Sequence, residues 1–375
     1  FGFSAWSLLL PDAKESTSER RYLAQFPAVS KDSILSGKFM TGFEDWSLDQ
    51  FPLRDNFRTL KAFTAFYLLR QKDNNDIYVV GGQAAKLDYP MHADSLDYAA
   101  SRFAWIYENL LKDADTRVWM SIVPDKNYFL AEANGYPSMD YAAFIAALRE
   151  KMPYADYVDI LDALTIDDYY TTDAHWRQEK LSAVAEKLAD ALGITLDKDY
   201  SSVTSDVPFY GVYYGQSALP LPADTLIYLT NETLAGCRVY DYETDSYIPV
   251  YDTDLLGGKD SYQAFLSGSK SLLRIENPAA TNDRELILFR DSFGSSLAPL
   301  LDRQLTAEGG FHMRVDDLRY CEEGGVEAAI HGETVLMGSA YFMKKRHVAL
   351  PHDLKLQTGL FLSVDGVLTA VFAVK

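Results

Sequence analysis

Two short segments that lie far apart in the chain hold the side-chain types of a Ser-His-Asp hydrolase or acyltransferase. Residues 172–176 read Thr-Asp-Ala-His-Trp, and residues 286–295 read Leu-Ile-Leu-Phe-Arg-Asp-Ser-Phe-Gly-Ser. In the first segment, Asp173 stands two positions before His175 in a polar turn. A carboxylate in that place can fix the tautomer of the imidazole, which can then act as a general base.

The second segment places Ser292 between an apolar, β-prone run and a stretch of helical character. At a strand-to-helix turn a serine hydroxyl is exposed, and backbone N–H groups of the helix start can face a developing oxyanion. The same position suits a helix N-cap, and an Asp-x-His spacing also arises by chance, so a structural role stays open. The chemical interpretation makes Ser292 the nucleophile, His175 the general base and Asp173 the orienting carboxylate.

Three further residues are candidates for the oxyanion hole or for substrate contacts: Lys126, Trp176 and Arg290. Lys126 follows a predicted strand, where it can bind a polar substrate group or lie in a solvated loop. Trp176, next to His175, is the aromatic residue best placed to stack on a sugar. No residue spacing is typical of a metal site, and acyl transfer needs only proton shuttling and oxyanion stabilisation, so neither metal nor cofactor is expected.

The composition is that of a globular protein. With 375 residues, 48% apolar and 24% charged, the chain can build one large domain or a domain with an insertion. The formal charge of −19 argues against a nucleic-acid partner or an anionic membrane surface, because both require a basic field. Cys237 and Cys321 can be buried thiols or, in an exported protein, one disulfide.

The hydrophobic periodicity predicts alternating helices and strands after an N-terminal arm at residues 1–52. Helices are expected at 53–70, 94–111, 138–152 and after the Asp-x-His motif, where Gly193 is the expected stop. Strands are expected at 77–80, 117–123 and 157–160. This alternation, over residues 53–200, predicts a mainly parallel sheet covered by helices.

A Tyr-rich, β-prone stretch at residues 201–283 predicts a β-rich insertion that packs over the mouth of the site. The α/β pattern resumes over residues 284–375. Strands are expected at 285–289, 312–316 and 334–338, helices from 295 and at 326–330, and a C-terminal hairpin over 359–374, which is also too interrupted to span a membrane. The later strands should join the same sheet, with Ser292 beyond the carboxyl end of its strand.

Several motifs along nearly the whole chain resemble the DHHW family, a branch of the SGNH hydrolase-like proteins related to the alginate O-acetylation proteins. They are Ser-Glu-Arg-Arg at 18–21, Asp-Gln-Phe-Pro-Leu-Arg-Asp at 49–55, Val-Pro-Asp-Lys at 123–126, Gly-Tyr-Pro at 135–137, the segment 173–176, Phe-Leu-Ser-Gly at 265–268 and Asp-Ser-Phe-Gly at 291–294. Ala174 stands where the family motif has the first of two histidines, whereas the acid and the second histidine remain as Asp173 and His175.

The resemblance implies an α/β fold, a three-layer α/β/α SGNH-like (flavodoxin-like) domain. Its motif order is circularly permuted, since the serine block comes first in ordinary SGNH hydrolases. In those enzymes a glycine block lends an N–H to the oxyanion hole, a role that Gly268 would take here, and Ser269 beside it is a further candidate for the oxyanion hole or for a substrate contact. A turn glycine is the alternative.

The resemblance also implies an exported protein, extracytoplasmic or anchored through a segment that precedes Phe1. It would act on acyl groups of cell-surface carbohydrate through an acyl-serine intermediate. Transfer to water makes it an esterase, and transfer to a sugar hydroxyl makes it an O-acetyltransferase. The expected partners are the carbohydrate or acetyl donor and a membrane-bound O-acyltransferase. The alternative is a catalytically silent envelope protein that binds carbohydrate or acts as a scaffold.

Overall fold

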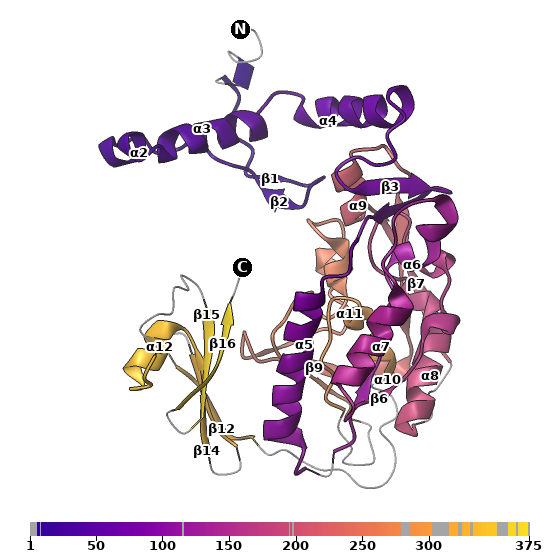
Figure 1. The fold of residues 1–375 in the computed structure, drawn as a ribbon, viewed down its shortest axis with the longest axis vertical. Helices are drawn as coiled ribbons and strands as arrows, with labels where there is room; N and C mark the ends of the chain where they lie inside the picture. Colours follow the sequence, from indigo (N-terminus) through magenta and orange to yellow (C-terminus); the bar gives the residue numbers. More distant parts are fainter. Residues whose placement is uncertain are drawn as a thin grey trace. The chain divides into compact units, whose positions relative to one another are not determined.

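The chain divides into two compact units, Phe1–Gly309 and Gly310–Lys375. The computed structural model (Figure 1) describes residues 6–7, 9–114, 116–194, 196, 199–278, 286–301, 315–321, 325–330, 333–350, 359–364 and 367–373. Among these residues, no helix is long and apolar enough to cross a membrane.

The first unit begins with a short hairpin and three helices. These elements are β1 (Glu15–Ser16), β2 (Arg21–Tyr22), α2 (Lys31–Leu35), α3 (Lys38–Asp49) and α4 (Arg54–Phe63), which a π-helical turn extends over Thr64–Leu68. Ser30 and Ser33 form a reciprocal capping box at the start of α2, which satisfies backbone N–H groups that a helix leaves unpaired. The helix predicted at 53–70 is thus confirmed, with a change of helix type near its end.

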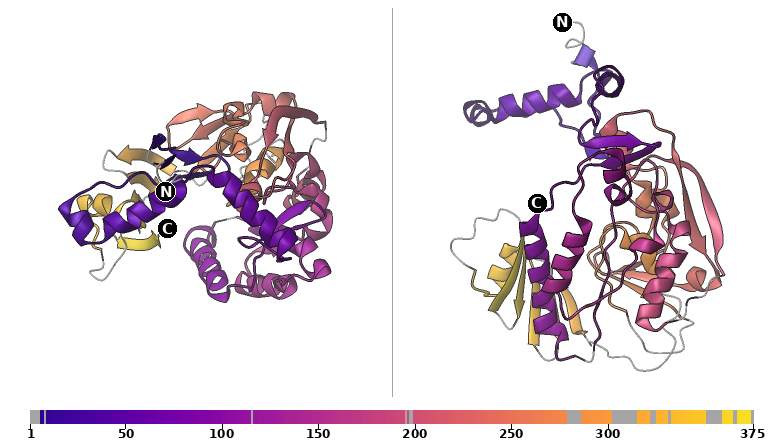
Figure 2. Two further views of the ribbon diagram at one scale, coloured as in Figure 1. Left: turned by 90° about the horizontal axis from the view of Figure 1, so that it is seen from above. Right: turned by 45° about the vertical axis from the view of Figure 1, so that its right-hand side comes forward.

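Helices and short strands alternate in the next part of the unit. They are β3 (Ile77–Val80), β4 (Gln83–Lys86), α5 (Ala93–Ile106), β5 (Trp119–Met120), α6 (Lys126–Leu130), α7 (Tyr141–Lys151), β6 (Asp156–Tyr157) and α8 (Ser182–Leu192), with short 3-10 or π turns between them. Helices α5 and α7 pack side by side, as two further views agree (Figure 2). Gly193 adopts φ +66° and ends α8, as predicted, because glycine tolerates the left-handed conformation.

The strand pairing differs from the mainly parallel sheet that the alternation predicts. Strand β3 pairs antiparallel with β4, since Gly81 and Gly82 both have positive φ and return the chain directly onto β3. Strands β5 and β6 make the one parallel pair among the described strands. The strand predicted at 285–289 is not observed, because residues 286–290 belong to neither a helix nor a strand and residue 285 lies outside the described residues. The fold is therefore mixed α/β with small, mostly antiparallel sheets.

In the stretch predicted to be β-rich, 201–283, the described residues 201–278 are rich in strands, as predicted, and belong to the same compact unit. Strand β7 (Ser201–Phe209) pairs with β8 (Asp224–Thr230), and β9 (Arg238–Asp241) lies between β10 (Ser246–Ile248) and β11 (Leu273–Glu276). Two short helices interrupt the strands, α9 (Val212–Ser217) and α10 (Glu232–Gly236).

One hydrophobic cluster joins the two candidate segments. Trp176 of the first segment is fully buried, and it shares a cluster with residues of α8 and with Leu297 and Leu300 of α11 (Gly294–Leu301), the helix that follows Ser292. Burying a large apolar side chain stabilises a fold by about 1.5–3 kcal/mol. Packing of this core therefore fixes the position of both candidate segments.

The second unit holds a five-stranded antiparallel sheet in the order β12 (Val315–Cys321), β13 (Gly325–Ile330), β14 (Glu333–Gly338), β15 (Gly359–Val364), β16 (Val367–Ala373). Helix α12 (Ala340–Lys345) packs against β14 and β15 (Figure 1). The strand at 334–338 and the C-terminal hairpin are confirmed. Residues 312–314 and the hairpin turn at 365–366 lie outside the described residues.

Two predictions for this unit are wrong. Residues 326–330 form a strand rather than a helix, because a short apolar run fits either period and Val326, Ala328 and Ile330 also alternate with a period of two. The strands after Ser292 pair with one another rather than with the earlier strands. Cys321 belongs to this unit, and Cys237, which follows α10, is partly buried in the first.

Candidate active site

The structure brings the hydroxyl, imidazole and carboxylate of the two predicted segments together. The Nε2 atom of His175 lies 2.8 Å from Oγ of Ser292. The Nδ1 atom of the same ring lies 2.5 Å from Oδ1 of Asp173. Ser292 is exposed and Asp173 is fully buried. An imidazole held in this way can take a proton from an accessible hydroxyl and keep its other N–H on a carboxylate.

The buried carboxylate of Asp173 has a partner for each oxygen. Oδ1 accepts from the backbone N–H of His175 at 3.1 Å as well as from its ring, and Oδ2 accepts from the N–H of Val212 at 2.7 Å. Nη1 of Arg20 lies 3.5 Å from Oδ2. Burial alone would raise the pKa of Asp173, but His175, Arg20 and the Val212 N–H outweigh it and hold that pKa well below its usual range. Asp173 is therefore ionised at neutral pH.

A buried lysine and an aspartate hold the Asp-x-His loop from two sides. Nζ of Lys126 donates to the carbonyl oxygens of Tyr170, Thr171 and Asp173, at 2.8, 3.1 and 3.4 Å. The carboxylate of Asp224 accepts from the N–H of Thr171 at 2.7 Å, and it also binds the next residue of the loop. Lys126 is only 2% exposed. The prediction that it binds a polar substrate group and the alternative that it lies in a solvated loop are therefore both wrong. Lys126 positions the loop instead.

We expect Lys126 to make stability depend on pH. Burial lowers the pKa of Lys126 from its ordinary value of 10.5 to about 7, against the opposing charges of Asp224 and Asp173. Between these two values the unfolded chain binds more protons than the folded one, so this group adds stability as pH rises from about 7 towards 10. Lys126→Met should lack that increase.

The measurement is the urea midpoint of wild type, Lys126→Met and Lys112→Met at pH 7 and pH 9. The advantage of wild type over Lys126→Met should grow with pH. Lys112 is half-exposed and pairs with Glu108 on the surface, so its variant should track wild type. A wild-type advantage over Lys126→Met that is the same at both pH values would contradict the expectation.

Gly211 allows the chain before α9 to approach the carboxylate. A Cβ atom at Gly211 would lie 2.3 Å from Cβ of Asp173 and 2.3 Å from the carbonyl oxygen of Thr172. The N–H of Gly211 donates to Oγ1 of Thr172 at 2.8 Å, and the next N–H, that of Val212, is the one that binds Asp173. Only glycine fits at this approach.

The turn around Ser292 is held by the side chain of Asp291. Its Oδ1 accepts from the N–H of Phe293 at 3.0 Å and more weakly from that of Gly294 at 3.4 Å. These N–H groups at the helix start, which the sequence pattern would direct at an oxyanion, are therefore engaged within the turn. Arg290 is partly buried in the same turn, where Nη1 donates to Oγ of Ser295 at 2.5 Å and burial lowers the pKa of its guanidinium.

Trp176 ties the two segments together rather than facing a ligand. Its Nε1–H donates to the carbonyl oxygen of Phe293 at 3.1 Å and to Oγ of Ser296 at 3.0 Å. The side chain is fully buried, so the prediction that it stacks on a sugar is wrong. The local pattern placed Trp176 beside His175 but could not give its burial, which depends on the packing of α8 and α11.

The turn at Gly268 does not present a free N–H. That N–H donates to the carbonyl oxygen of Phe265 at 3.1 Å, and Gly268 has φ +80°. The turn-glycine alternative therefore fits the structure, and the oxyanion role does not. Ser269, the next residue, is exposed.

Sequence reasoning missed an aromatic support of the imidazole. The ring of Tyr262 stacks on the ring of His175, with centroids 3.9 Å apart and an interplanar angle of 12°. The Tyr262 hydroxyl lies 2.9 Å from Oγ of Ser296, the same atom that Trp176 binds. No local pattern marks Tyr262, because its contact with His175 is long-range.

No protein-family model and no curated protein matches the sequence. Solved structures do. A DHHW family protein from Eubacterium siraeum is similar in structure, with 20% identity and a TM-score of 0.49 over 62% of this chain and 81% of that one. PatB1 of Bacillus cereus, solved with a sulfonyl adduct, gives 17% identity and a TM-score of 0.47 over 60% and 82%.

The O-acetyltransferase domain of Pseudomonas putida AlgJ is a third similar structure, with 17% identity and a TM-score of 0.33 over 41% of this chain and 64% of that one. The chain thus resembles a DHHW family protein in structure, as its motifs predicted. Among the described residues of this chain, no group of three or more His, Cys, Asp or Glu side chains is arranged to hold a metal ion.

Proposed function

We propose that this protein is a serine acyl-transfer enzyme that moves an acetyl group to or from a carbohydrate hydroxyl. The observation that carries the proposal is the continuous chain of contacts from Ser292 Oγ through both nitrogens of His175 to Asp173, at 2.8 and 2.5 Å. An exposed hydroxyl, an imidazole and a buried ionised carboxylate in this order are the parts that nucleophilic acyl transfer requires.

The reaction begins as Ser292 Oγ attacks the acyl carbonyl carbon and Nε2 of His175 takes the hydroxyl proton. The Nδ1–H of His175 stays on Asp173, whose charge stabilises the imidazolium. The tetrahedral intermediate then expels the donor's alkoxide, which receives the proton from Nε2, and an acyl-serine remains. An acceptor hydroxyl then attacks the acyl carbonyl carbon as Nε2 of His175 takes its proton, and the new tetrahedral intermediate expels Ser292 Oγ, which receives that proton from Nε2.

The acceptor determines the name of the activity. Water makes the protein an esterase, and a sugar hydroxyl makes it an O-acetyltransferase. The choice of acetyl and carbohydrate rests on the resemblance of the sequence motifs to the DHHW family. Export, an extracytoplasmic or membrane-anchored location, and a membrane-bound O-acyltransferase partner are proposals on the same ground.

An SGNH-like α/β core is also a proposal. The parallel pairing of β5 with β6 supports it, together with the alternation of α5, α7 and α8 with extended segments. So does the position of Ser292, in the turn immediately before α11.

The test is incubation of the protein with a small activated acetyl ester, with and without cell-wall oligosaccharides. Mass spectrometry of the sugars and release of acetate distinguish the products. Acetylated sugar identifies an O-acetyltransferase, and acetate alone identifies an esterase. If neither appears with any donor, the catalytically silent binding or scaffolding protein becomes the better account.

A further inference from the structure

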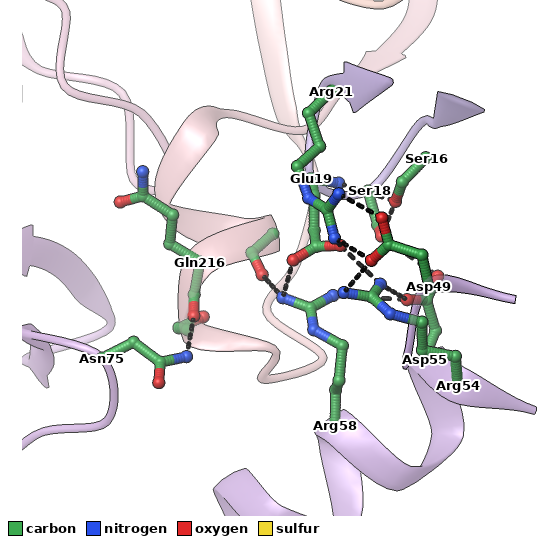
Figure 3. Close-up of polar contacts among 12 residues, drawn as sticks. Ser16, Ser18, Glu19, Arg21, Asp49, Arg54, Asp55, Arg58, Asn75 and Gln216 are labelled. Carbon is green, nitrogen blue, oxygen red and sulfur yellow. Dashed lines mark hydrogen bonds and ion pairs between the residues drawn. The ribbon is translucent and has the colours of Figure 1, made fainter. Parts of the chain in front are cut away.

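The hairpin of β1 and β2 docks on the part of the chain that borders the site. Ser18 lies so close to α9 that a Cβ atom at Gly215 would be 1.6 Å from the Ser18 carbonyl oxygen. Arg58 of α4 donates to the carbonyl oxygen of Gly215 at 2.5 Å. It also pairs with Glu19 at 3.4 Å (Figure 3). Arg54 also pairs with Glu19. These contacts fix the hairpin against α4 and α9.

The docked hairpin directs Arg20 at the candidate site. Nη1 of Arg20 lies 2.9 Å from Oδ1 of Asp260 and 3.5 Å from Oδ2 of Asp173. Nη2 donates to the carbonyl oxygen of Tyr210 at 2.6 Å. The side chain is 11% exposed, so these contacts are shielded from solvent and salt. Nη1 thus contacts both carboxylates while Nη2 holds a backbone carbonyl, and the several N–H donors of one guanidinium make these contacts at the same time.

The backbone of Arg20 is in the left-handed region, with φ +56°. That conformation is unfavourable for a side chain with a Cβ atom and is common for glycine or asparagine. An arginine whose backbone is in this strained conformation, and whose side chain contacts two carboxylates, has the features of a functional site.

The two carboxylates that Arg20 contacts both support His175. Asp173 binds the edge of the imidazole at Nδ1. Asp260 accepts from the N–H of Tyr262 at 3.1 Å, at the start of the turn Ser261–Ala264, and the ring of Tyr262 stacks on the face of the imidazole. Arg20 therefore contacts the supports of both the edge and the face of the general base.

The charges explain why a cation is needed between these acids. Burial raises the pKa of Asp260, the guanidinium of Arg20 opposes that increase, and the negative charge of Asp173 adds to it. Without Arg20, two partly or fully buried carboxylates would repel each other next to His175. Repulsion of that kind moves side chains or protonates one of the acids.

We infer that Arg20 is a positioning residue, delivered by the N-terminal hairpin, that holds Asp173 and Asp260 in place so that His175 is oriented towards Ser292. This inference rests on the proposed acyl-transfer function for its kinetic test. Arg20 itself touches neither the hydroxyl nor the imidazole in the described contacts, so it acts through the two acids.

The kinetic test compares Arg20→Gln with wild type and with Lys270→Gln. Lys270 makes the matched control, since it pairs at 2.8 Å with another fully buried carboxylate, Asp241, in the β9 region. Misplacement of the general base predicts a fall in kcat of about 10- to 100-fold with KM within about twofold of wild type. Lys270→Gln should keep the wild-type kcat.

Two further variants separate positioning from general destabilisation. Adding Asp260→Asn to Arg20→Gln removes one of the repelling charges and should restore part of kcat. Arg20→Lys keeps the cation without the planar fork and should fall between wild type and Arg20→Gln. Equal kcat for Arg20→Gln and Lys270→Gln would overturn the inference, and so would a loss in Arg20→Gln that neither variant relieves.

A measurement without turnover keeps this inference distinguishable from the proposed function. Nuclear magnetic resonance of histidine-labelled protein reports the ring N–H of His175, whose signal should shift or broaden in Arg20→Gln and stay unchanged in Lys270→Gln. If wild type transfers no acyl group but the signal shifts, the proposed function fails and the role of Arg20 stands. If the signal is identical in all three proteins, Arg20 does not position the imidazole.

Discussion

Ser292→Ala is expected to abolish acyl transfer while leaving the fold nearly as stable as wild type. The hydroxyl is exposed and, among the described residues, its side-chain partner is His175, so its removal should lower the free energy of unfolding by about 1 kcal/mol. A methyl group cannot attack a carbonyl, and turnover of a small acetyl ester should fall by at least about 10⁴-fold. Ester hydrolysis and urea unfolding measure the two effects.

Ser101→Ala is the matched control for this prediction. Ser101 is also exposed, and its hydroxyl donates to the carbonyl oxygen of Tyr98 within α5 at 2.7 Å. The control should keep wild-type turnover. If Ser292→Ala retains turnover comparable to Ser101→Ala, Ser292 is not the nucleophile.

Asp173→Asn is expected to produce the second largest loss. The amide can turn its NH2 group towards Nδ1 of His175, which favours the tautomer with the proton on Nε2 and removes the base that faces Ser292. The neutral amide also loses the charge that stabilises the imidazolium, so kcat should fall by about 10⁴-fold. Two quantities are measured for this variant: kcat and the urea midpoint of unfolding.

Asp241→Asn provides the comparison for this variant, since Asp241 is equally buried and paired with Lys270. Both variants remove a buried carboxylate and should lower the unfolding midpoint, but only Asp173→Asn should lose turnover. An equally large fall in kcat for the two variants would show that loss of a buried carboxylate destabilises the protein in general, and that the orientation of His175 does not account for the effect.

The elements that sequence reasoning predicted well have strong local signals. Gly193 ends α8 because a glycine at a helix C-terminus readily takes positive φ, and the apolar stripe before it sets the buried face. The strand at 77–80 has the predicted bounds. Its antiparallel pairing with β4 was not predicted, although Gly81-Gly82 between two short β-prone runs is a hairpin signal.

The residues of the site also fall into those with a local sequence signal and those without one. Asp173 and His175 are neighbours in sequence, and Ser292 stands in a recognisable turn, so residue type and local pattern were enough to propose them. Their supports come from distant segments: Arg20 from the N-terminal hairpin, and Tyr262 from the turn after residue 260. No single-sequence pattern joins such positions, because only packing brings them together.

The roles assigned to Lys126 and Trp176 were wrong for a related reason. Both residues lie next to the site, but an ammonium or an indole next to a site can face the ligand or the interior. Burial decides between these alternatives, and burial is a property of the folded chain. Here both side chains face inward and hold the loops that carry His175 and Ser292.

Mass spectrometry of the acetyl-enzyme tests the central claim most directly. Wild type and Ser292→Ala are incubated with an activated acetyl ester, quenched in acid and digested. The proposed mechanism predicts one acetyl group on the wild-type peptide that contains Ser292 and none on the corresponding peptide of the variant. An adduct that forms equally on the variant, or a wild-type protein that never acquires one with any donor, would contradict the assignment of Ser292 as the nucleophile.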